Sequence, residues 1–294
     1  MRQGRFTINK NFDSLVSPQL EPCDRSWLYV APGKWPTFLW ILGIHITAAA
    51  GLVVFPLPSW PLLLGMVALA LMGGLGTTVC YHRSLSHRAV KLHPLIENIL
   101  IFAACFNGSS HPIGWVASHR LHHSYSDKPG DISSPHGGGF WWSHLRWLWQ
   151  TDRPDRTRWC PDLDRPSYRF WEIASGPVVA LSFLFGLLFD PVAWLWLGPV
   201  RLVWVLHAQC SINSISHMGR SNRFGDYSQN VTWLTPFILG IGENWHFNHH
   251  RAPGQARIGR GPQIDLGWCA IRVLQCFRLA ERAQKKIRPA GSPI

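Results

Sequence analysis

The chain is poor in charged residues and lacks any closely spaced pair of cysteines. Only 15% of its 294 residues are charged, whereas 47% are hydrophobic. Its seven cysteines are scattered, and none has the C-x-x-C spacing typical of iron–sulfur clusters and cysteine-ligated zinc sites. Cys80 and Cys210 lie in apolar stretches, which favours small buried hydrophobic side chains. The sequence therefore argues against a redox or metal centre built on cysteine.

Charge is scarcest in four long apolar runs. They cover about residues 35–55, 60–81, 170–189 and 192–210, and the fourth contains one cation, Arg201. At ~1.5 Å per residue, each run is long enough to cross a hydrocarbon core of ~30 Å as a helix. No cleavage pattern of small residues follows the first run, so we expect it to remain as a membrane anchor. We therefore predict four transmembrane helices.

The turns between paired runs contain no lysine or arginine. Nearly all the basic residues lie in the segments outside the hairpins, which the positive-inside rule assigns to the cytoplasm. The prediction is an all-α, multi-pass integral membrane protein with both termini cytoplasmic, in the inner membrane if its source is bacterial. The expected parts are an N-terminal segment (1–34), a transmembrane hairpin (35–81), a cytoplasmic helical cap (82–168), a second hairpin (169–210), and the rest of the cap with a basic tail (211–294).

The formal net charge is +12. Such a balance can indicate nucleic-acid binding. Because the basic residues here flank apolar runs, membrane orientation explains them better, and we predict no nucleic-acid partner. A positive cytoplasmic surface favours anionic lipid head groups, phosphate-bearing substrates or an acidic redox partner.

Histidines gather in clusters on the predicted cytoplasmic face. The clustered residues are His82 and His87; His119, His122 and His123; Asn213 and His217; and His246, His249 and His250. Spacings of three and four residues put side chains on one face of a helix. The five-residue spacing of the first pair lets its rings converge if the helix opens or turns there.

Nine histidines exceed what one ion can bind. A structural zinc takes four ligands and a catalytic zinc usually three, so two metals with four or five histidines each would use them all. Imidazole suits iron, zinc, copper and nickel, and the ligand type leaves the metal open. No cluster contains Asp or Glu, which argues against the glutamate-rich di-iron sites of soluble bundles. For a single H-x-x-H-H motif, an ordinary histidine cluster at the membrane interface is an alternative to metal binding. It does not explain the whole set.

Several residues near the clusters or within the runs have more than one interpretation. Asp127, Asp131 and Glu243 either orient ligating imidazoles by accepting their second N–H or lie in solvated loops. For His45 and His207, inside apolar runs, we expect hydrogen bonds between helices. The remaining histidines are expected to support the site or to lie on the surface, and these are His93, His111, His136 and His144.

The order H-x-x-x-x-H, H-x-x-H-H, N-x-x-x-H, H-x-x-H-H resembles that of the membrane fatty acyl desaturases. The similarity is greatest to the acyl-CoA Δ9 (stearoyl-CoA desaturase-like) group and its bacterial acyl-lipid relatives. It covers about residues 37–280 and includes flanking sequences such as Tyr81-His82-Arg83 and Gly242-Glu243-Asn244-Trp245-His246. The resemblance implies that the nine clustered histidines hold two irons and that Asn213 reaches a metal through water. Zinc can replace iron in recombinant protein, since imidazole binds both.

The resemblance also implies a reaction. It is the O2-dependent introduction of a cis double bond, at the Δ9 position, into a saturated acyl chain carried by CoA or a lipid. Two electrons must come from outside, and the chain has no flavin, haem or iron–sulfur signature, so a ferredoxin or cytochrome b5-type donor is implied. Met66 and Ala70, one helical turn apart, are candidates to limit the acyl chain length, with ordinary helix packing as the alternative for each.

Two other functions stay open at the level of the sequence. A membrane hydroxylase with the same two irons would share the hydrogen-abstraction step and release an alcohol. A non-catalytic metal-binding or metal-transport protein belongs to a different class. The lack of an ionisable path across the predicted spans argues against transport.

Overall fold

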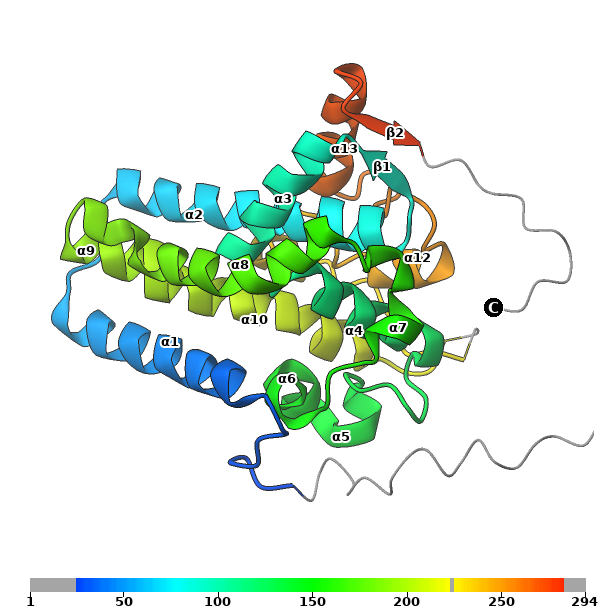
Figure 1. The fold of residues 1–294 in the computed structure, drawn as a ribbon, viewed down its shortest axis with the longest axis horizontal. Helices are drawn as coiled ribbons and strands as arrows, with labels where there is room; N and C mark the ends of the chain where they lie inside the picture. Colours follow the sequence, from blue (N-terminus) through cyan, green and yellow to red (C-terminus); the bar gives the residue numbers. More distant parts are fainter. Residues whose placement is uncertain (1–24, 223–224, 283–294) are drawn as a thin grey trace, which may run out of the picture.

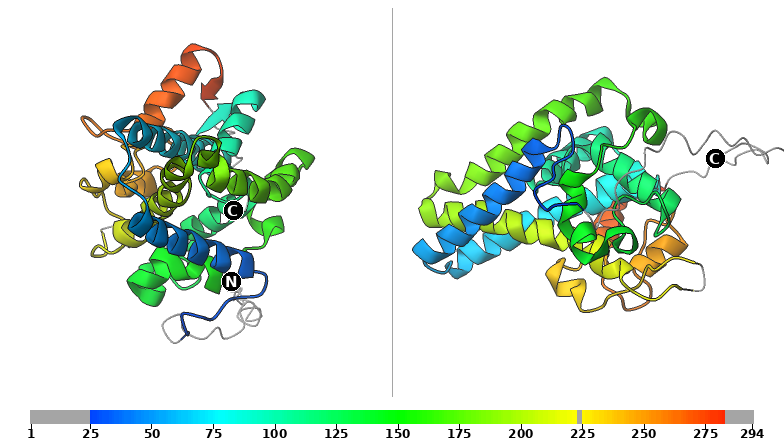
Figure 2. Two further views of the ribbon diagram at one scale, coloured as in Figure 1. Left: turned by 90° about the vertical axis from the view of Figure 1, so that its left-hand side faces the viewer. Right: turned by 90° about the horizontal axis from the view of Figure 1, so that it is seen from below.

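Four long helices run side by side, with their short connections at one end and a helical cap at the other (Figure 1). This computed structural model describes residues 25–222 and 225–282, so the basic tail predicted beyond Arg282 lies outside the described residues. The view from below shows the same separation between the long helices and the cap (Figure 2, right). The architecture confirms the predicted mainly helical membrane fold.

The long helices are α1, α2, α8 and α10, and shorter helical segments extend three of them. Their bounds are α1 (Trp35–Val54), α2 (Trp60–Leu75), α8 (Pro166–Leu184) and α10 (Arg201–Ser214). The extensions are η3 (Gly76–Ser86), η6 (Phe185–Leu188), α9 (Pro191–Leu195), η7 (Trp196–Val200) and η8 (Ile215–His217). With these extensions, four helices are long and apolar enough to cross a membrane, and they cover Trp35–Val54, Trp60–Ser86, Pro166–Leu188 and Pro191–His217.

The outward faces of the long helices are apolar. Large side chains such as Ile46, Leu64 and Leu181 remain at least half exposed within the protein. A water-soluble protein would bury such a continuous surface, whereas a membrane protein covers it with lipid. The exposure therefore supports the membrane assignment.

The sequence predicted that the second span ends directly before His82. In the structure the helix does not end there. It continues to Ser86 as the π-helix η3, in which each turn is one residue wider than in an α-helix. The wider turn accommodates the five-residue spacing of His82 and His87, whose ring centroids lie 5.0 Å apart. The polar residues of η3 stay helical because the cap buries all of them. The expected convergence of the two histidines is thus achieved by opening the helix.

The cap surrounds this end of the second span. Its remaining elements are β1 (Val90–Leu92), α3 (Pro94–Phe106), α4 (Pro112–Tyr125), α5 (Pro135–Trp141), η4 (Trp142–Arg146), α6 (Trp147–Gln150), α7 (Arg156–Trp159), η5 (Pro161–Leu163), α11 (Leu234–Phe237), α12 (His246–Arg251), α13 (Leu266–Cys276) and β2 (Ala280–Arg282). β1 and β2 form a short antiparallel pair that the sequence analysis did not predict. The main apolar core lies among η3, α3, α4 and α13, and includes Tyr81, Ile101, Val116 and Ile271.

Two glycines let α3 pack directly on the second span. A Cβ atom at Gly73 would lie 2.1 Å from the Asn107 side chain, and one at Gly76 would lie 2.4 Å from the Leu100 carbonyl oxygen. Both distances are shorter than any tolerable contact, so only glycine fits. Small residues allow such close packing between helices in a membrane.

Arg201 is fully buried inside the fourth span. Its guanidinium donates hydrogen bonds to the Asn107 and Ser182 side chains and, at 2.7 Å, to the Leu197 carbonyl. Asn107 in turn donates to the Ala70 carbonyl at 2.9 Å. No carboxylate forms an ion pair with Arg201 in residues 25–222 or 225–282. The cation therefore joins α2, α3, α8 and α10 through neutral partners, as intramembrane charges do when they face a bundle interior.

A chain of histidines links α1, α10 and the cap. The Nδ1 of His45 lies 2.7 Å from the Ile41 carbonyl oxygen, and its Nε2 lies 3.0 Å from Nε2 of His207. Nδ1 of His207 is 2.8 Å from Nε2 of His144, whose Nδ1 is 2.9 Å from the Ser214 hydroxyl. The interhelical hydrogen bonds expected for His45 and for His207 are confirmed, and the structure shows that the two residues contact each other.

The neutral form of His144 fixes how it bonds within this chain. Burial and the neighbouring His207 lower the pKa of His144 to about 4, so this ring is neutral near neutral pH. Its two nitrogens then carry one proton between them. In its contacts with His207 and Ser214, His144 therefore donates one hydrogen bond and accepts the other.

Replacing both His45 and His207 by leucine tests their contact. Each single substitution should lower the free energy of unfolding by about 1 kcal/mol, because its partner loses a buried hydrogen bond. The double variant should lose less than the sum, by about 0.6 kcal/mol or more, since the second substitution removes a nitrogen that the first has already left without its partner. Unfolding in detergent micelles measures these values, with the lipid-facing Ile46→Ala as the control. Strictly additive losses would contradict the contact.

Candidate metal centre

All nine predicted histidine ligands converge in the cap. They form a first group, His82, His87, His119, His123 and His249, and a second group, His122, His217, His246 and His250. Within each group, one candidate ligand atom per residue lies within 4.8 Å of every other. The sequence therefore predicted which histidines come together, although it did not predict how they divide.

Two short helices serve both groups. On α4, His119 and His123 point to the first group, and His122 points to the second. On α12 the assignment is reversed. His249 belongs to the first group, and His246 and His250 belong to the second. Residues four apart share a helix face, while an adjacent residue lies about 100° around the axis. Each helix thus stands between the two groups.

The nitrogen atoms are spaced as ligands of an ion would be. In the first group, Nε2 of His249 lies 3.0 Å from Nε2 of His82 and 2.8 Å from Nε2 of His123. In the second, Nε2 of His246 lies 2.9 Å from Nε2 of His217 and 3.1 Å from Nε2 of His250. Two nitrogens bound at ~2.1 Å and at right angles to one ion are about 3.0 Å apart. The donor set therefore fits two metal ions.

Carboxylates orient three of the imidazoles, one in the first group and two in the second. The pairs, measured from Nδ1 to oxygen, are His82 with Glu243 at 2.7 Å, His122 with Asp131 at 2.8 Å and His217 with Asp127 at 2.7 Å. Each carboxylate accepts a hydrogen bond from the Nδ1–H group. The lone pair on Nε2 is then left facing the histidine group. The orienting role proposed for these three acids from the sequence is therefore the one that their contacts support.

His122 illustrates how a metal would complete the site. Its Nε2 is buried and has no hydrogen-bond partner among residues 25–222 and 225–282, while its Nδ1 contacts Asp131. Burial opposes protonation of this ring, but Asp131 outweighs it and raises the pKa of His122. A buried nitrogen without a partner is costly in an ordinary interior. A bound cation would satisfy that nitrogen and replace the charge of the proton.

Most other rings of the two groups are held in the neutral form. Burial, followed by repulsion from neighbouring imidazoles, lowers the pKa of His119, His123, His246, His249 and His250 well below the ordinary histidine value. Metals bind neutral imidazole, because a protonated ring has no lone pair to donate. These five rings are therefore already in the protonation state that metal binding requires.

A buried arginine supports the first group, and the sequence analysis missed it. Arg83 is 1% exposed and lies 3.8 Å from the Glu243 carboxylate. It donates to Asp265 at 2.8 Å and to the backbone carbonyl of Ile241 at 3.1 Å. Its position next to His82 was the available signal, because an arginine buried beside a ligand needs acidic partners. Arg83 thereby fixes the segment that carries Glu243.

The other histidines mostly have structural roles. His136 is the exception that reaches the site, since its Nε2 lies 2.9 Å from the backbone oxygen of His217. The ring nitrogens of His93 and His111 accept hydrogen bonds from the first turns of α3 and α4, respectively. These contacts agree with the expectation of supporting or peripheral positions.

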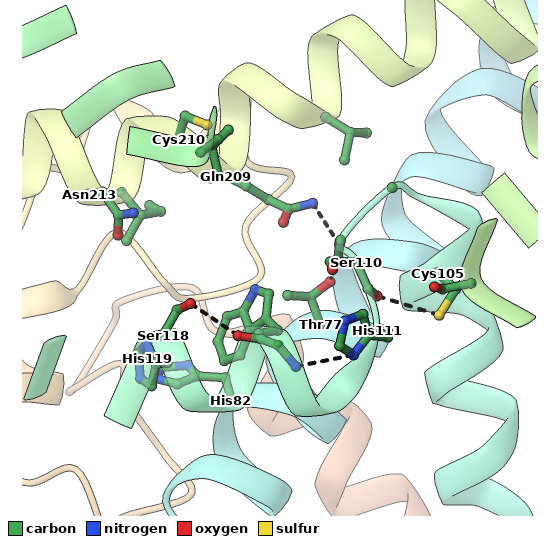
Figure 3. Close-up of a pocket in the computed structure, with 18 of the residues that line it drawn as sticks. Thr77, His82, Cys105, Ser110, His111, Ser118, His119, Gln209, Cys210 and Asn213 are labelled. Carbon is green, nitrogen blue, oxygen red and sulfur yellow. Dashed lines mark hydrogen bonds between the residues drawn. The ribbon is translucent and has the colours of Figure 1, made fainter. Parts of the chain in front are cut away.

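A cavity of about 920 Å³ opens beside both groups. His82, His119, His122 and His246 line it, and so does Asn213, which α10 presents from the opposite wall (Figure 3). The shared cavity is compatible with a water between Asn213 and a metal, and that role stays a prediction. The volume is in the range of sites that enclose small ligands.

The cavity continues away from the histidines along the second span. Its wall there consists of Ala70, Gly74, Thr77 and Thr78, with Ala70 farthest from the metal groups. Met66, the other residue proposed to limit chain length, does not line it and packs against Ala193 and Leu197 instead. Only Ala70 of the two therefore faces the space available to an acyl chain.

Comparison with known proteins settles the family. Residues 58–257 match the family model described as Fatty acid desaturase. The chain belongs to the fatty acid desaturase family. It is thus an oxidoreductase of lipid metabolism, and its histidine groups are compatible with metal binding.

Three relatives illustrate the similarity. The chain is 35% identical over 233 residues to Delta-9 acyl-lipid desaturase 1 of Arabidopsis thaliana, covering 76% of this chain and 75% of the relative. It is 33% identical over 263 residues to sn-1 stearoyl-lipid 9-desaturase of Anabaena variabilis, covering 84% and 92%. It is 34% identical over 257 residues to hex-5-enoyl-[acyl-carrier protein] acetylenase of Moorena producens, covering 78% of each.

Replacing Glu243 by glutamine tests the orienting carboxylates. The amide keeps the shape but no longer holds the proton on Nδ1 of His82 by charge, so metal affinity should fall about 10- to 100-fold. Competition with a chelator, followed by metal analysis, measures the change. Glu97→Gln is the matched control, because Glu97 accepts a hydrogen bond from Tyr168 in the cap without touching either group. Equal metal affinity in both variants would contradict the role of Glu243.

Proposed function

We propose that the protein is a di-iron, O2-dependent acyl desaturase that introduces a cis double bond at the Δ9 position of a saturated acyl chain. The observation that carries this proposal is the pair of histidine groups at one end of a cavity large enough for an acyl chain. The Δ9 position is supported by the names of two relatives, which are described as Delta-9 and 9-desaturases.

The histidine groups are proposed to hold one iron each, with Asn213 contacting a metal through water. When bound, iron supplies the activation of O2 that cleavage of an unactivated C–H bond requires. The chain's own residues position the ligands and the acyl chain. Glu243, Asp131 and Asp127 keep the Nε2 lone pairs directed inward, and the cavity walls hold the acyl chain at a fixed depth. Position decides which carbon reacts, and a dry cavity limits side reactions.

The electrons and the orientation are also part of the proposal. We found no flavin, haem or iron–sulfur signature in the sequence, so a ferredoxin or cytochrome b5-type protein is proposed as the donor. A net charge of +12 would favour an acidic donor surface. The positive-inside rule supports a cytoplasmic position for the cap and for both termini.

Substituting Ala70 tests the proposed placement of the acyl chain. The Ala70 side chain is buried, lines the cavity and lies twelve residues before His82 on the same span. Ala70→Trp should fill the far end and shift the products to shorter acyl chains, measured by chromatography of fatty acid esters. Met66→Trp, on a residue outside the cavity wall, is the control. An unchanged product profile for Ala70→Trp would contradict the placement.

Lipid profiling of a host that lacks its own Δ9 desaturase tests the reaction. Wild-type protein should produce monounsaturated chains with the double bond at carbon 9, located by mass spectrometry. His122→Ala removes a ligand nitrogen and should reduce the product by at least ~100-fold, whereas His93→Ala, which affects only a helix cap, should retain activity. An alcohol in place of the alkene would identify a hydroxylase. If the iron is stoichiometric and the donor is active, the absence of any oxidised product would overturn the proposal.

A further inference from the structure

Helix α13 has two apolar faces, and the described part of the chain covers only one of them. The inward face is buried in the cap or packs against the main apolar core, and it consists of Gly267, Ala270, Ile271 and Leu274. The outward face is exposed and consists of Leu266, Cys269, Val273, Cys276 and the C-cap residue Phe277. Its first four residues recur at intervals of three and four, so they form one stripe along the helix. A stripe in which Val273 is 57% exposed needs an apolar partner.

The remaining side of α13 is polar. The Arg272 guanidinium lies 5.7 Å from the Trp268 ring centroid, and its Nη1 donates to the Gln275 side chain at 3.3 Å. An apolar stripe bordered by arginine and tryptophan is typical of helices that lie in a membrane interface. With 11 residues, α13 is too short to cross the hydrocarbon core. Its pattern therefore suits the surface of a bilayer.

The position of α13 in the fold agrees with this pattern. The helix packs against α2 and against its extension η3, where the second span enters the cap. It projects outward past the long helices in Figure 1 and in the left view of Figure 2. A helix that projects sideways at this level meets the surface of the bilayer that the long helices cross.

Exposed apolar side chains connect α13 to the fourth span. Ile264 and Leu266 pack over Gly240, where a Cβ atom would lie 2.9 Å from Ile264. Gly240 follows α11, and the carbonyl of Phe237 in α11 accepts a hydrogen bond from the Trp204 indole of the fourth span at 3.1 Å. Ile264 and Phe237 are themselves exposed, at 54% and 38%. The lipid that covers the spans therefore has a continuous apolar path to the outward face.

The size of the outward face favours lipid over a second copy of the chain. A helix of 11 residues is about 16 Å long and about 10 Å wide. A stable protein–protein interface buries about 800 Å² on each partner, which is well above what one side of such a helix offers. Lipid has no such minimum here, because the spans already hold the protein in the membrane.

The start of α13 is connected to the first histidine group. The Asp265 carboxylate accepts a hydrogen bond from the Trp268 backbone N–H at 2.9 Å and another from Arg83 at 2.8 Å. Arg83 lies 3.8 Å from Glu243, the carboxylate that orients His82. Displacing α13 would therefore displace Asp265 and loosen this series of contacts.

We infer that the outward face of α13 docks on the cap-side surface of the lipid bilayer and thereby holds Asp265 in place beside Arg83. The partner is the membrane itself. Its acyl chains cover the apolar stripe, and its head groups surround Arg272 and Trp268. The inference depends on the membrane assignment and not on the reaction that the protein catalyses.

Fluorescence quenching in vesicles of phosphatidylcholine and phosphatidylglycerol tests the docking. A bimane label is attached at position 273 through Val273→Cys and, as the matched control, at position 275 through Gln275→Cys. Two residues are about 200° apart around a helix, so the labels lie on opposite sides. Cys23, Cys269 and Cys276 are replaced by alanine in both variants, and the other four cysteines are buried.

Phosphatidylcholine brominated high on its acyl chains should quench the label at position 273 at least about twofold more than the label at position 275. The reason is that the apolar face of an interfacial helix lies ~5–10 Å inside the head-group boundary. Equal quenching at both positions would overturn the inference. So would a label at position 273 that lipid does not quench, whether aqueous iodide reaches it or a second copy or a terminal segment covers it.

Val273→Glu tests the link to Asp265. Its side chain is exposed within the protein, so the substitution opposes docking without disturbing the internal packing. Iron affinity in vesicles, measured by chelator competition, should fall about threefold or more, which is less than the 10- to 100-fold expected for groups that contact ligands. Gln275→Glu is the control and should keep the wild-type affinity. Equal affinity in both variants would overturn the link, and neither measurement requires product formation.

Discussion

The structure depends on directing imidazole lone pairs to two common points inside the protein. A neutral imidazole has one lone pair, and its direction depends on which nitrogen holds the proton. Glu243, Asp131 and Asp127 fix that choice for His82, His122 and His217 through contacts of 2.7–2.8 Å. Burying three carboxylates has its own cost, and further hydrogen bonds offset it. Those bonds come from Thr78, Ser133 and Ser134, and Arg83 adds an ion pair with Glu243 at 3.8 Å.

The membrane helices serve the same requirement. The second and fourth spans enter the cap and end with ligands, as His82 and His217 lie in their last turns. The spans are joined to each other by Arg201 and by the histidine chain from His45 to Ser214, both of which use neutral partners. In lipid such contacts replace the hydrophobic effect as a source of specific packing. The position of the ligands is therefore set partly inside the membrane.

Much of the site could be predicted from the sequence because ligand chemistry allows few residue types and helices allow few spacings. The nine histidines and the three carboxylates follow from those local rules, whereas the partner that His45 finds in His207 does not. The division of the histidines into two groups could not be predicted, since it depends on how α4 and α12 face each other. The role of Arg83 depends on Asp265, 182 residues away, and the β1–β2 pairing joins residues 188 to 192 positions apart. Local patterns contain no information about such partners.

The extent of helices was the least predictable feature. The π-helix begins at Gly76 within an apolar run and continues through polar residues that composition assigns to the cap. Met66 and Ala70 were equivalent in the sequence, being one turn apart, yet only Ala70 faces the cavity. The difference arises from packing of Met66 against the segment leading into α10, which a pattern of apolar residues does not reveal.

The distribution of ligands on α4 has a mechanical consequence. His122 and His123 are adjacent in the chain and serve different groups, as His249 and His250 do on α12. The distance between the two groups is therefore set by the pitch of two helices rather than by how separate elements of the fold pack together. A change in this distance would therefore require side-chain or backbone changes on both α4 and α12. The two centres are in this sense coupled through two single helices.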